Sequence, residues 1–92
     1  MVSPAERWTI RFEHAAEKEF RKLDPQIAHR ILSFLYERVT PNPRSLGEPL
    51  HGNLLGGYLK YRVGDYRIVA ELHDHELVVM VLHIGHRREV YR

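Results

Sequence analysis

The sequence of 92 residues contains no cysteine and no long run of apolar residues. Without cysteine the chain can form neither a disulfide framework nor a zinc site with thiolate ligands. The first twelve residues hold no apolar stretch of the length that a signal peptide or a membrane span requires. These absences favour a protein of the reducing cytoplasm that does not contact a membrane.

Length and composition predict one globular domain that spans residues 1–92. A hydrophobic content of 43% is normal for a folded protein and excludes disorder. The formal net charge of +2 and the sequence pI near 9.2 make the chain only mildly basic. The positions of the charges therefore say more about an acidic partner than their sum does.

The first half of the chain predicts one strand and two helices. Residues 7–12 alternate between polar and apolar side chains, which is typical of a strand with one buried face. Residues 14–23 change to helical spacing. A second helix is predicted from Pro25 to Val39, with Asp24 as its N-cap and Pro41 as its stop.

A segment rich in proline and glycine follows, at residues 40–57. It predicts a long loop, and a loop of this length without structure of its own is often functional. We expect Leu46 and the later leucines of this segment to hold the loop against the core.

A β-hairpin is predicted around Gly64 and Asp65, which separate the strand-like runs 58–63 and 66–72. A two-residue loop that begins with glycine is a common hairpin connection. A third strand is predicted at residues 77–84. Because this stretch is apolar on both faces, we expect it in the interior of the sheet.

The two-residue loop also fixes which residues of the hairpin lie opposite each other. Arg62 should face Arg67, and Lys60 should face Val69. Since side chains alternate between the faces of a sheet, one face is apolar and the other gathers these three cations beside Tyr58. Like charges that face each other destabilise a sheet, so this cluster is easiest to explain if an anion binds there.

The C-terminal tail adds His86, Arg87, Arg88 and Tyr91 to the basic character of this region. Gly85 interrupts the alternation before them. The spacing therefore leaves open the face to which Arg87 points.

The predicted order β-α-α-β-β-β indicates an α+β fold. We expect a small, mostly antiparallel sheet of about four strands with the two N-terminal helices packed on one face. The first strand should join at an edge or as a parallel neighbour.

In its order of elements and motifs the chain resembles the RelE/ParE family of toxins from bacterial type II toxin–antitoxin systems, and its RelE-like branch in particular. The resemblance covers nearly the whole chain. Its most specific pieces are GDYRIV at residues 64–69 and HIGHRREVY at residues 83–91, together with NPRSLGEPLHGNLLGG at residues 42–57. Each piece is weak alone, but the order, spacing and chain length are specific. The resemblance implies a RelE/ParE-like, microbial ribonuclease-like fold.

The resemblance further implies a toxin that cleaves mRNA on the ribosome and is held inactive by a cognate antitoxin. Cleavage in this branch needs no metal and no cofactor: the ribose 2′-hydroxyl attacks the adjacent phosphate and leaves a 2′,3′-cyclic phosphate and a 5′-hydroxyl. Carried over by position, the catalytic residues are Lys60, Arg67, Arg87 and Tyr91. The residues expected to bind the substrate are Tyr58, Arg62, His86 and Arg88. Tyr58 stands where the RelE pattern has a second lysine, which leaves the identity of the base open.

Two other functions fit parts of the same pattern. One is a ParE-like inhibitor of DNA gyrase that blocks replication, although such toxins generally lack the full basic set. The other is a module that only binds, and that reaches operator DNA through the complex with the antitoxin. The seven histidines form no recognised ligand motif such as HExxH, so no metal site is predicted.

Overall fold

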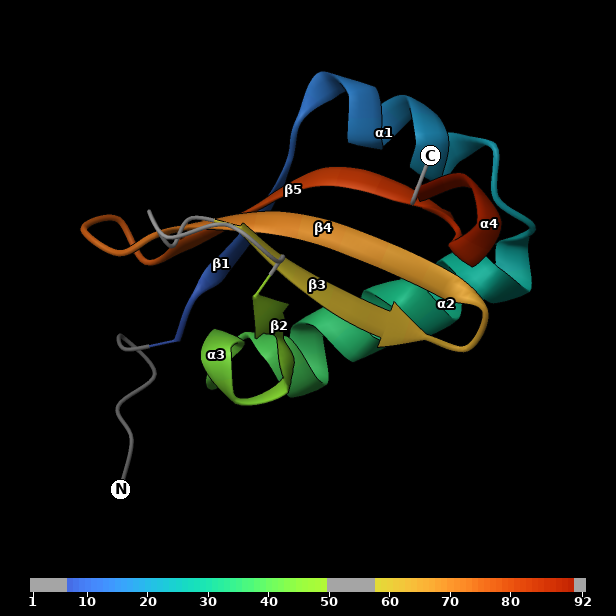
Figure 1. The fold of residues 1–92 in the computed structure, drawn as a ribbon. Helices are drawn as coiled ribbons and strands as arrows, with labels where there is room; N and C mark the ends of the chain where they lie inside the picture. Colours follow the sequence, from blue (N-terminus) through green and yellow to red (C-terminus); the bar gives the residue numbers. More distant parts are fainter. Residues whose placement is uncertain (1–6, 50–57, 91–92) are drawn as a thin grey trace.

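The structure is a computed structural model that describes residues 7–49 and 58–90 (Figure 1). The elements in chain order are β1 (Thr9–Phe12), α1 (His14–Arg21), α2 (Pro25–Phe34), the π-helical turn η2 (Leu35–Val39), α3 (Pro43–Leu46), β2 (Glu48–Pro49), β3 (Tyr58–Val63), β4 (Tyr66–His73), β5 (Val78–His86) and α4 (Arg87–Val90).

One sheet organises the fold, with the strand order β1-β5-β4-β3-β2. β1 pairs with β5 in parallel, whereas the other three pairings are antiparallel. The predicted α+β class is thus confirmed, and of the two positions predicted for the first strand, at an edge or as a parallel neighbour, both apply. β5 lies between β1 and β4, in the interior where its apolar sequence placed it. The sheet has five strands instead of about four, because Glu48–Pro49 pairs with β3.

The helix predicted from Pro25 to Val39 is confirmed, and its last turn is wider than an α-helix. Asp24 caps its start by accepting a hydrogen bond from the Gln26 amide at 3.2 Å, a contact that stabilises a helix by about 1 kcal/mol. At its end the Thr40 amide donates to the Leu35 carbonyl at 3.0 Å, which gives the π-helical turn η2. None of the helices in the described ranges is long and apolar enough to cross a membrane.

The helix α1 continues along the edge of β5 where β1 ends. The Glu13 amide donates to the Val81 carbonyl at 2.8 Å, next to the last residue of β1. Further along, the carboxylate Oε1 of Glu19 accepts a hydrogen bond from the Ile84 amide at 2.8 Å. The Glu19 carboxylate thereby accepts the hydrogen bond of a backbone amide at the edge of β5, which a longer β1 would otherwise have accepted.

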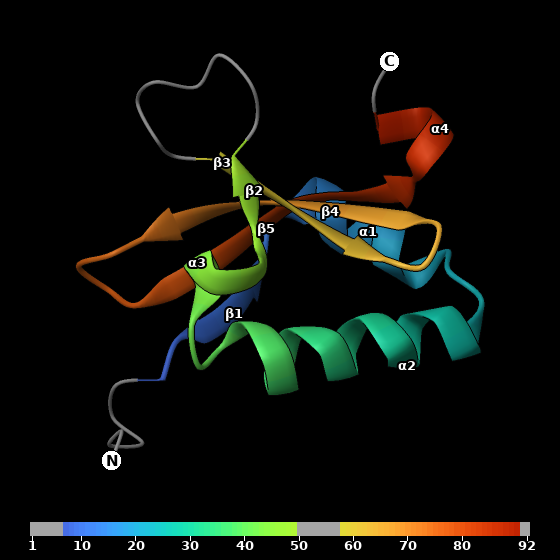
Figure 2. The ribbon, with the colours of Figure 1, turned by 60° about the horizontal axis from the view of Figure 1, so that its bottom comes forward.

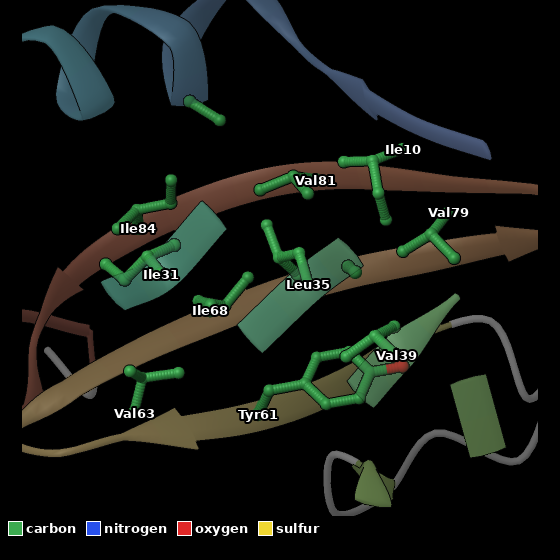
Figure 3. Close-up of a cluster of buried hydrophobic side chains, with 12 residues drawn as sticks. Ile10, Ile31, Leu35, Val39, Tyr61, Val63, Ile68, Val79, Val81 and Ile84 are labelled. Carbon is green, nitrogen blue, oxygen red and sulfur yellow. The ribbon is translucent and has the colours of Figure 1, made fainter. Parts of the chain in front are cut away.

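The hydrophobic core lies between α2 and one face of the sheet (Figure 3). The helical side contributes Ile31, Leu35 and Val39, all fully buried. The sheet contributes Tyr61, Val63, Ile68, Ala70, Val79, Val81 and Ile84. Burial of each large apolar side chain stabilises the fold by about 1.5–3 kcal/mol. This packing fixes which face of β3 and β4 points away from α2.

The predicted loop at residues 40–57 is wrong for its first part. The structure forms α3 and β2 there, and Leu46 is 38% exposed instead of held against the core. The contact that anchors this segment is the Tyr61 hydroxyl, which donates to the Pro43 carbonyl at 2.6 Å. Residues 50–57 and the leucines expected to pack from them lie outside the described residues.

We expect Tyr61→Phe to lower the free energy of unfolding by about 1–2 kcal/mol, because the buried Pro43 carbonyl loses its donor. Burial raises the pKa of Tyr61 to about 12. The folded state therefore favours the neutral phenol. The free energy of unfolding that this preference contributes is complete below the unfolded pKa of about 10 and is lost as the pH rises from there toward 12. Urea unfolding at several pH values measures both effects.

Tyr36→Phe is the matched control for this prediction, since Tyr36 is 50% exposed. Equal stabilities of the two variants at neutral pH would contradict the role given to Tyr61.

Candidate functional site

Three cations lie on the face of β3 and β4 that points away from α2. Arg62 pairs with Arg67 and Lys60 pairs with Val69, as the two-residue loop predicted. Because Tyr61, Val63 and Ile68 point into the core, the side chains that alternate with them point to the other face. We call Lys60, Arg62 and Arg67 the basic cluster.

Arg67 is buried, with 9% of its surface exposed. Its Nη1 donates to the Gly64 carbonyl at 3.0 Å and to the Tyr66 carbonyl at 2.9 Å. On β5 its partner in the register is Gly85, which has no side chain to compete for the space above the strand. The Nε of Arg67 is buried and has no hydrogen-bond partner within residues 7–49 and 58–90. One edge of a buried guanidinium is thus held by carbonyls while Nε keeps an unused donor.

The turn at Gly64 and Asp65 connects Arg67 with Arg87. Gly64 has a φ of 59°, the left-handed conformation expected at the first central position of a type II′ turn. While Arg67 donates to the carbonyl of Gly64, the backbone amide of Arg87 donates to the carbonyl of Asp65 at 2.8 Å. Arg87 begins α4, which stands on the side of the sheet opposite α2 (Figure 2). The structure thus brings the start of the basic tail to the face that carries the basic cluster.

A carboxylate that the sequence analysis did not select lies beside the basic cluster. Glu48 on β2 pairs with Lys60 on β3. Its Oε1 is 3.6 Å from Lys60 Nζ and 3.5 Å from Arg62 Nη2. Lys60 is largely covered, with 13% of its side chain exposed, whereas Glu48 and Arg62 are about half exposed. Glu48 offsets the repulsion among the cations and adds a proton acceptor to the face.

The other predicted substrate-binding residues occupy different positions. Tyr58 is 42% exposed and lies on β3 opposite Glu71, two residues before Lys60 on the same face. Arg88 is exposed and follows Arg87 in α4. The catalytic prediction for Tyr91 lies outside the described residues.

His86 points to the helical side of the sheet. It pairs with Tyr66, which alternates with Arg67, and the two rings meet edge to face with centroids 5.7 Å apart. The same ring accepts a hydrogen bond at Nδ1 from the Arg88 amide at 3.3 Å. His86 therefore supports the start of α4, and the structure does not bring its side chain to the basic cluster.

The described residues hold no group of three or more histidine, aspartate or glutamate side chains arranged to bind a metal ion. His73 instead contacts two carboxylates, with its Nε2 3.1 Å from Glu71 and its Nδ1 3.7 Å from Glu76. The hydrogen bond with Glu71, followed by the charges of both glutamates, raises the pKa of His73. This cluster lies at the β4–β5 turn, at the other end of β4 from the Gly64 turn.

Comparison with known proteins identifies the family. Residues 10–91 match the model of the family described as the ParE toxin of the type II toxin–antitoxin system, parDE. The chain belongs to this toxin family. The match includes every strand and helix after the first residue of β1, so the basic face is part of the shared domain.

The toxin's relatives place it in the RelE-like branch. It is 31% identical to the toxin RelG of Mycobacterium tuberculosis over 85 residues, which cover 92% of this chain and 97% of that protein. It is 34% identical to the mRNA interferase toxin RelE of Escherichia coli over 82 residues, which cover 87% and 85% of the two chains.

Solved structures show the same fold. The toxin–antitoxin complex RelBE2 of Mycobacterium tuberculosis matches with a TM-score of 0.79 at 30% identity, over 88% of this chain and 99% of that chain. The isolated Escherichia coli toxin RelE matches with a TM-score of 0.75 at 31% identity, over 91% and 90% of the two chains. The predicted RelE/ParE-like fold is confirmed.

We expect Glu48→Gln to tighten the binding of single-stranded RNA, because the change removes the negative charge next to Lys60 and Arg62. One such charge is worth about 1 kcal/mol at contact distance in water, or about fivefold in affinity at low salt. Fluorescence anisotropy with a short labelled RNA measures the change. Glu76→Gln, at the distant β4–β5 turn, is the control; an equal gain there would show a general charge effect.

Proposed function

We propose that this toxin is an endoribonuclease that cleaves mRNA on the ribosome in the cytoplasm, inhibits translation and is neutralised by a cognate antitoxin. The observation that carries the proposal is the buried guanidinium of Arg67, whose Nε has no partner in the described part of the chain. A buried donor of this kind favours an anionic ligand. A relative that the chain matches over most of its length is named an mRNA interferase, which supports RNA as the source of the anion.

Arg67 is suited to hold the scissile phosphate. Its Nη1 is engaged by the carbonyls of Gly64 and Tyr66, which fix the plane of the guanidinium. The Nε edge keeps an N–H that is unpaired within the described residues, and a phosphate oxygen would reach this buried atom once the groups over it move aside. Guanidinium has matching geometry for phosphate. The transition state carries additional negative charge on these oxygens. A fixed donor in a site with little water stabilises that charge by about 2.7–4 kcal/mol.

The reaction requires one proton acceptor and one proton donor. The 2′-hydroxyl loses its proton as its oxygen forms a bond to phosphorus, and the bond to the 5′-oxygen breaks as that oxygen takes up a proton. Glu48 is a carboxylate beside the basic cluster that can accept the first proton, while the neighbouring ammonium of Lys60 stabilises the charge on the phosphate. Among the predicted residues, Arg87 would bind the phosphate from α4, and Tyr91 would supply the second proton or stack on a base. No metal takes part in this scheme.

The remaining predicted residues would bind the RNA on either side of the phosphate. Arg62 is 59% exposed beside Glu48, and Tyr58 extends the same face along β3. Arg88 adds a cation next to Arg87. We assign no contact with RNA to His86, because its ring packs on Tyr66 at the helical side.

The proposed partners are the ribosome with its mRNA and a cognate antitoxin. Solved complexes of related toxins contain RelB antitoxins, which supports a protein antitoxin here. Contact with operator DNA would come only through the complex with the antitoxin. The basic cluster is small for a free ribonuclease, so the ribosome would supply much of the affinity for the substrate.

The alternative is inhibition of DNA gyrase, which the ParE name of the family favours. The two functions differ in their first effect after induction of the toxin. Translation falls first in one case, and DNA supercoiling changes first in the other. Mapping of transcript 5′ ends after brief induction adds a direct test, because cuts at a constant position within codons indicate cleavage on the ribosome.

We expect Arg67→Ala and Arg87→Ala each to slow mRNA cleavage by about 10²–10³-fold, since each removes a fixed donor to the phosphate. Growth arrest after induction and cleavage of mRNA on purified ribosomes measure the loss. Arg67→Lys tests the geometry, because an ammonium keeps the charge but cannot reproduce the fork of donors.

Arg21→Ala is the matched control for both arginines. Arg21 is 72% exposed on α1 and contacts Glu17 at 3.4 Å, away from the basic face. Full toxicity of both site variants, with the control unchanged, would contradict the nuclease. Each variant must also still bind the antitoxin, which shows that it is folded.

A further inference from the structure

Residues 43–49, which comprise α3, Gly47 and β2, carry Glu48 to the basic face. We call them the Glu48 segment. Two of its residues pair with β3, Glu48 with Lys60 and Pro49 with Leu59. Proline has no amide hydrogen to donate, so this two-residue strand forms few backbone hydrogen bonds. The position of the Glu48 carboxylate therefore depends on contacts made elsewhere in the segment.

Two of these contacts reach the core side of the sheet. The Tyr61 hydroxyl holds the first residue of the segment by its hydrogen bond to the Pro43 carbonyl. Gly47 packs so closely on β3 that a Cβ built on it would lie 3.0 Å from Leu59 Cδ1 and 3.1 Å from Tyr61 Cε1. Its φ of −79° is open to any residue, so close approach is what requires glycine here.

The third contact joins the Glu48 segment to the β4–β5 turn. Arg44 Nη1 donates to Asp74 Oδ1 at 2.9 Å, and Arg44 Nη2 donates to Asp74 Oδ2 at 3.0 Å. Asp74 lies in the β4–β5 turn, where its own carbonyl accepts a hydrogen bond from the Leu77 amide at 3.3 Å. Paired parallel hydrogen bonds of this kind fix orientation as well as distance.

The exposure of this pair limits what it contributes to stability. Arg44 and Asp74 have 55% and 57% of their side chains exposed, and exposed pairs stabilise proteins little. Their mutual hydrogen bond lowers the pKa of Asp74 and raises that of Arg44. The main effect of the pair is therefore on geometry. It holds α3 in place at Arg44, which lies four residues before Glu48 in the sequence.

We propose that Arg44 is a positioning residue for mRNA cleavage: its fork on Asp74 holds the Glu48 segment so that the Glu48 carboxylate lies between Lys60 and Arg62. This inference rests on the proposed function and adds to it a residue that does not touch the substrate. Loss of the fork removes the contact of α3 with the β4–β5 turn and leaves those at Pro43, Gly47 and β2, so that the carboxylate shifts relative to the 2′-hydroxyl. Small displacements of a reacting group have large effects on rate.

A double-mutant cycle tests this role. We expect Arg44→Ala to slow single-turnover cleavage on mRNA-loaded ribosomes by about tenfold, without a change in the affinity of the toxin for the ribosome. Asp74→Ala should give the same loss, because it removes the other half of the fork. In a Glu48→Gln background the further change Arg44→Ala should have no effect on the rate, since no carboxylate remains to be positioned.

Exchange of the two residues of the Arg44–Asp74 pair tests whether the rate is recovered, and a change in a remote ion pair is the control. The double variant Arg44→Asp with Asp74→Arg should recover most of the rate that either single change loses. Arg21→Ala removes an arginine from an exposed ion pair on α1 and should leave the rate unchanged. An unchanged rate in Arg44→Ala, or an equal loss with and without the Glu48 carboxylate, would overturn the positioning role.

A readout without activity separates this inference from the proposed function. If the wild-type toxin cleaves no mRNA, the nuclease proposal fails, and the ¹³Cδ resonance of Glu48 still reports its surroundings. We expect that resonance to shift in Arg44→Ala and to stay in place in Arg21→Ala. An identical resonance in wild type and Arg44→Ala would show that the fork does not place the carboxylate.

Discussion

The pairing of β3 with β4 is the constraint on which the rest of the structure depends. The turn at Gly64 and Asp65 has two central residues, so the register cannot slip without a change of turn. A slip by one residue would send Tyr61 and Ile68 to solvent and the cations into the core. The burial of the apolar face by α2 and the exposure of the basic face are therefore two results of one register.

The same turn also organises the chemistry of the face. Its consecutive carbonyls at Gly64, Asp65 and Tyr66 accept hydrogen bonds from the Arg67 guanidinium and from the Arg87 amide. One rigid feature thus positions a residue from β4 and the start of α4.

The sequence predicted those parts of the structure that turn length and helix capping determine uniquely. A two-residue loop determines that Arg62 faces Arg67, and proline after aspartate marks the start of α2. It did not predict β2, because a two-residue strand that includes Pro49 shows no alternation. Glu48 was missed for the same reason. The orientation of His86 did not follow from the pairing of the hairpin, because a bulge at Val69 and Ala70 shifts the register of β5 by one residue before it reaches Tyr66.

The burial of Arg67 is the feature on which the proposed binding of an anion at this small face depends. An unpaired donor inside the protein costs about 1–3 kcal/mol, and a phosphate that accepts its hydrogen bond removes that cost on binding. An exposed arginine has no such cost to recover, because water already satisfies it. Glu48 acts in the opposite sense, since it offsets the charge of Lys60 and Arg62 while no anion is bound. In the proposed function the face therefore combines one buried cation, whose Nε is unpaired in the described residues, with two cations whose charge Glu48 partly offsets.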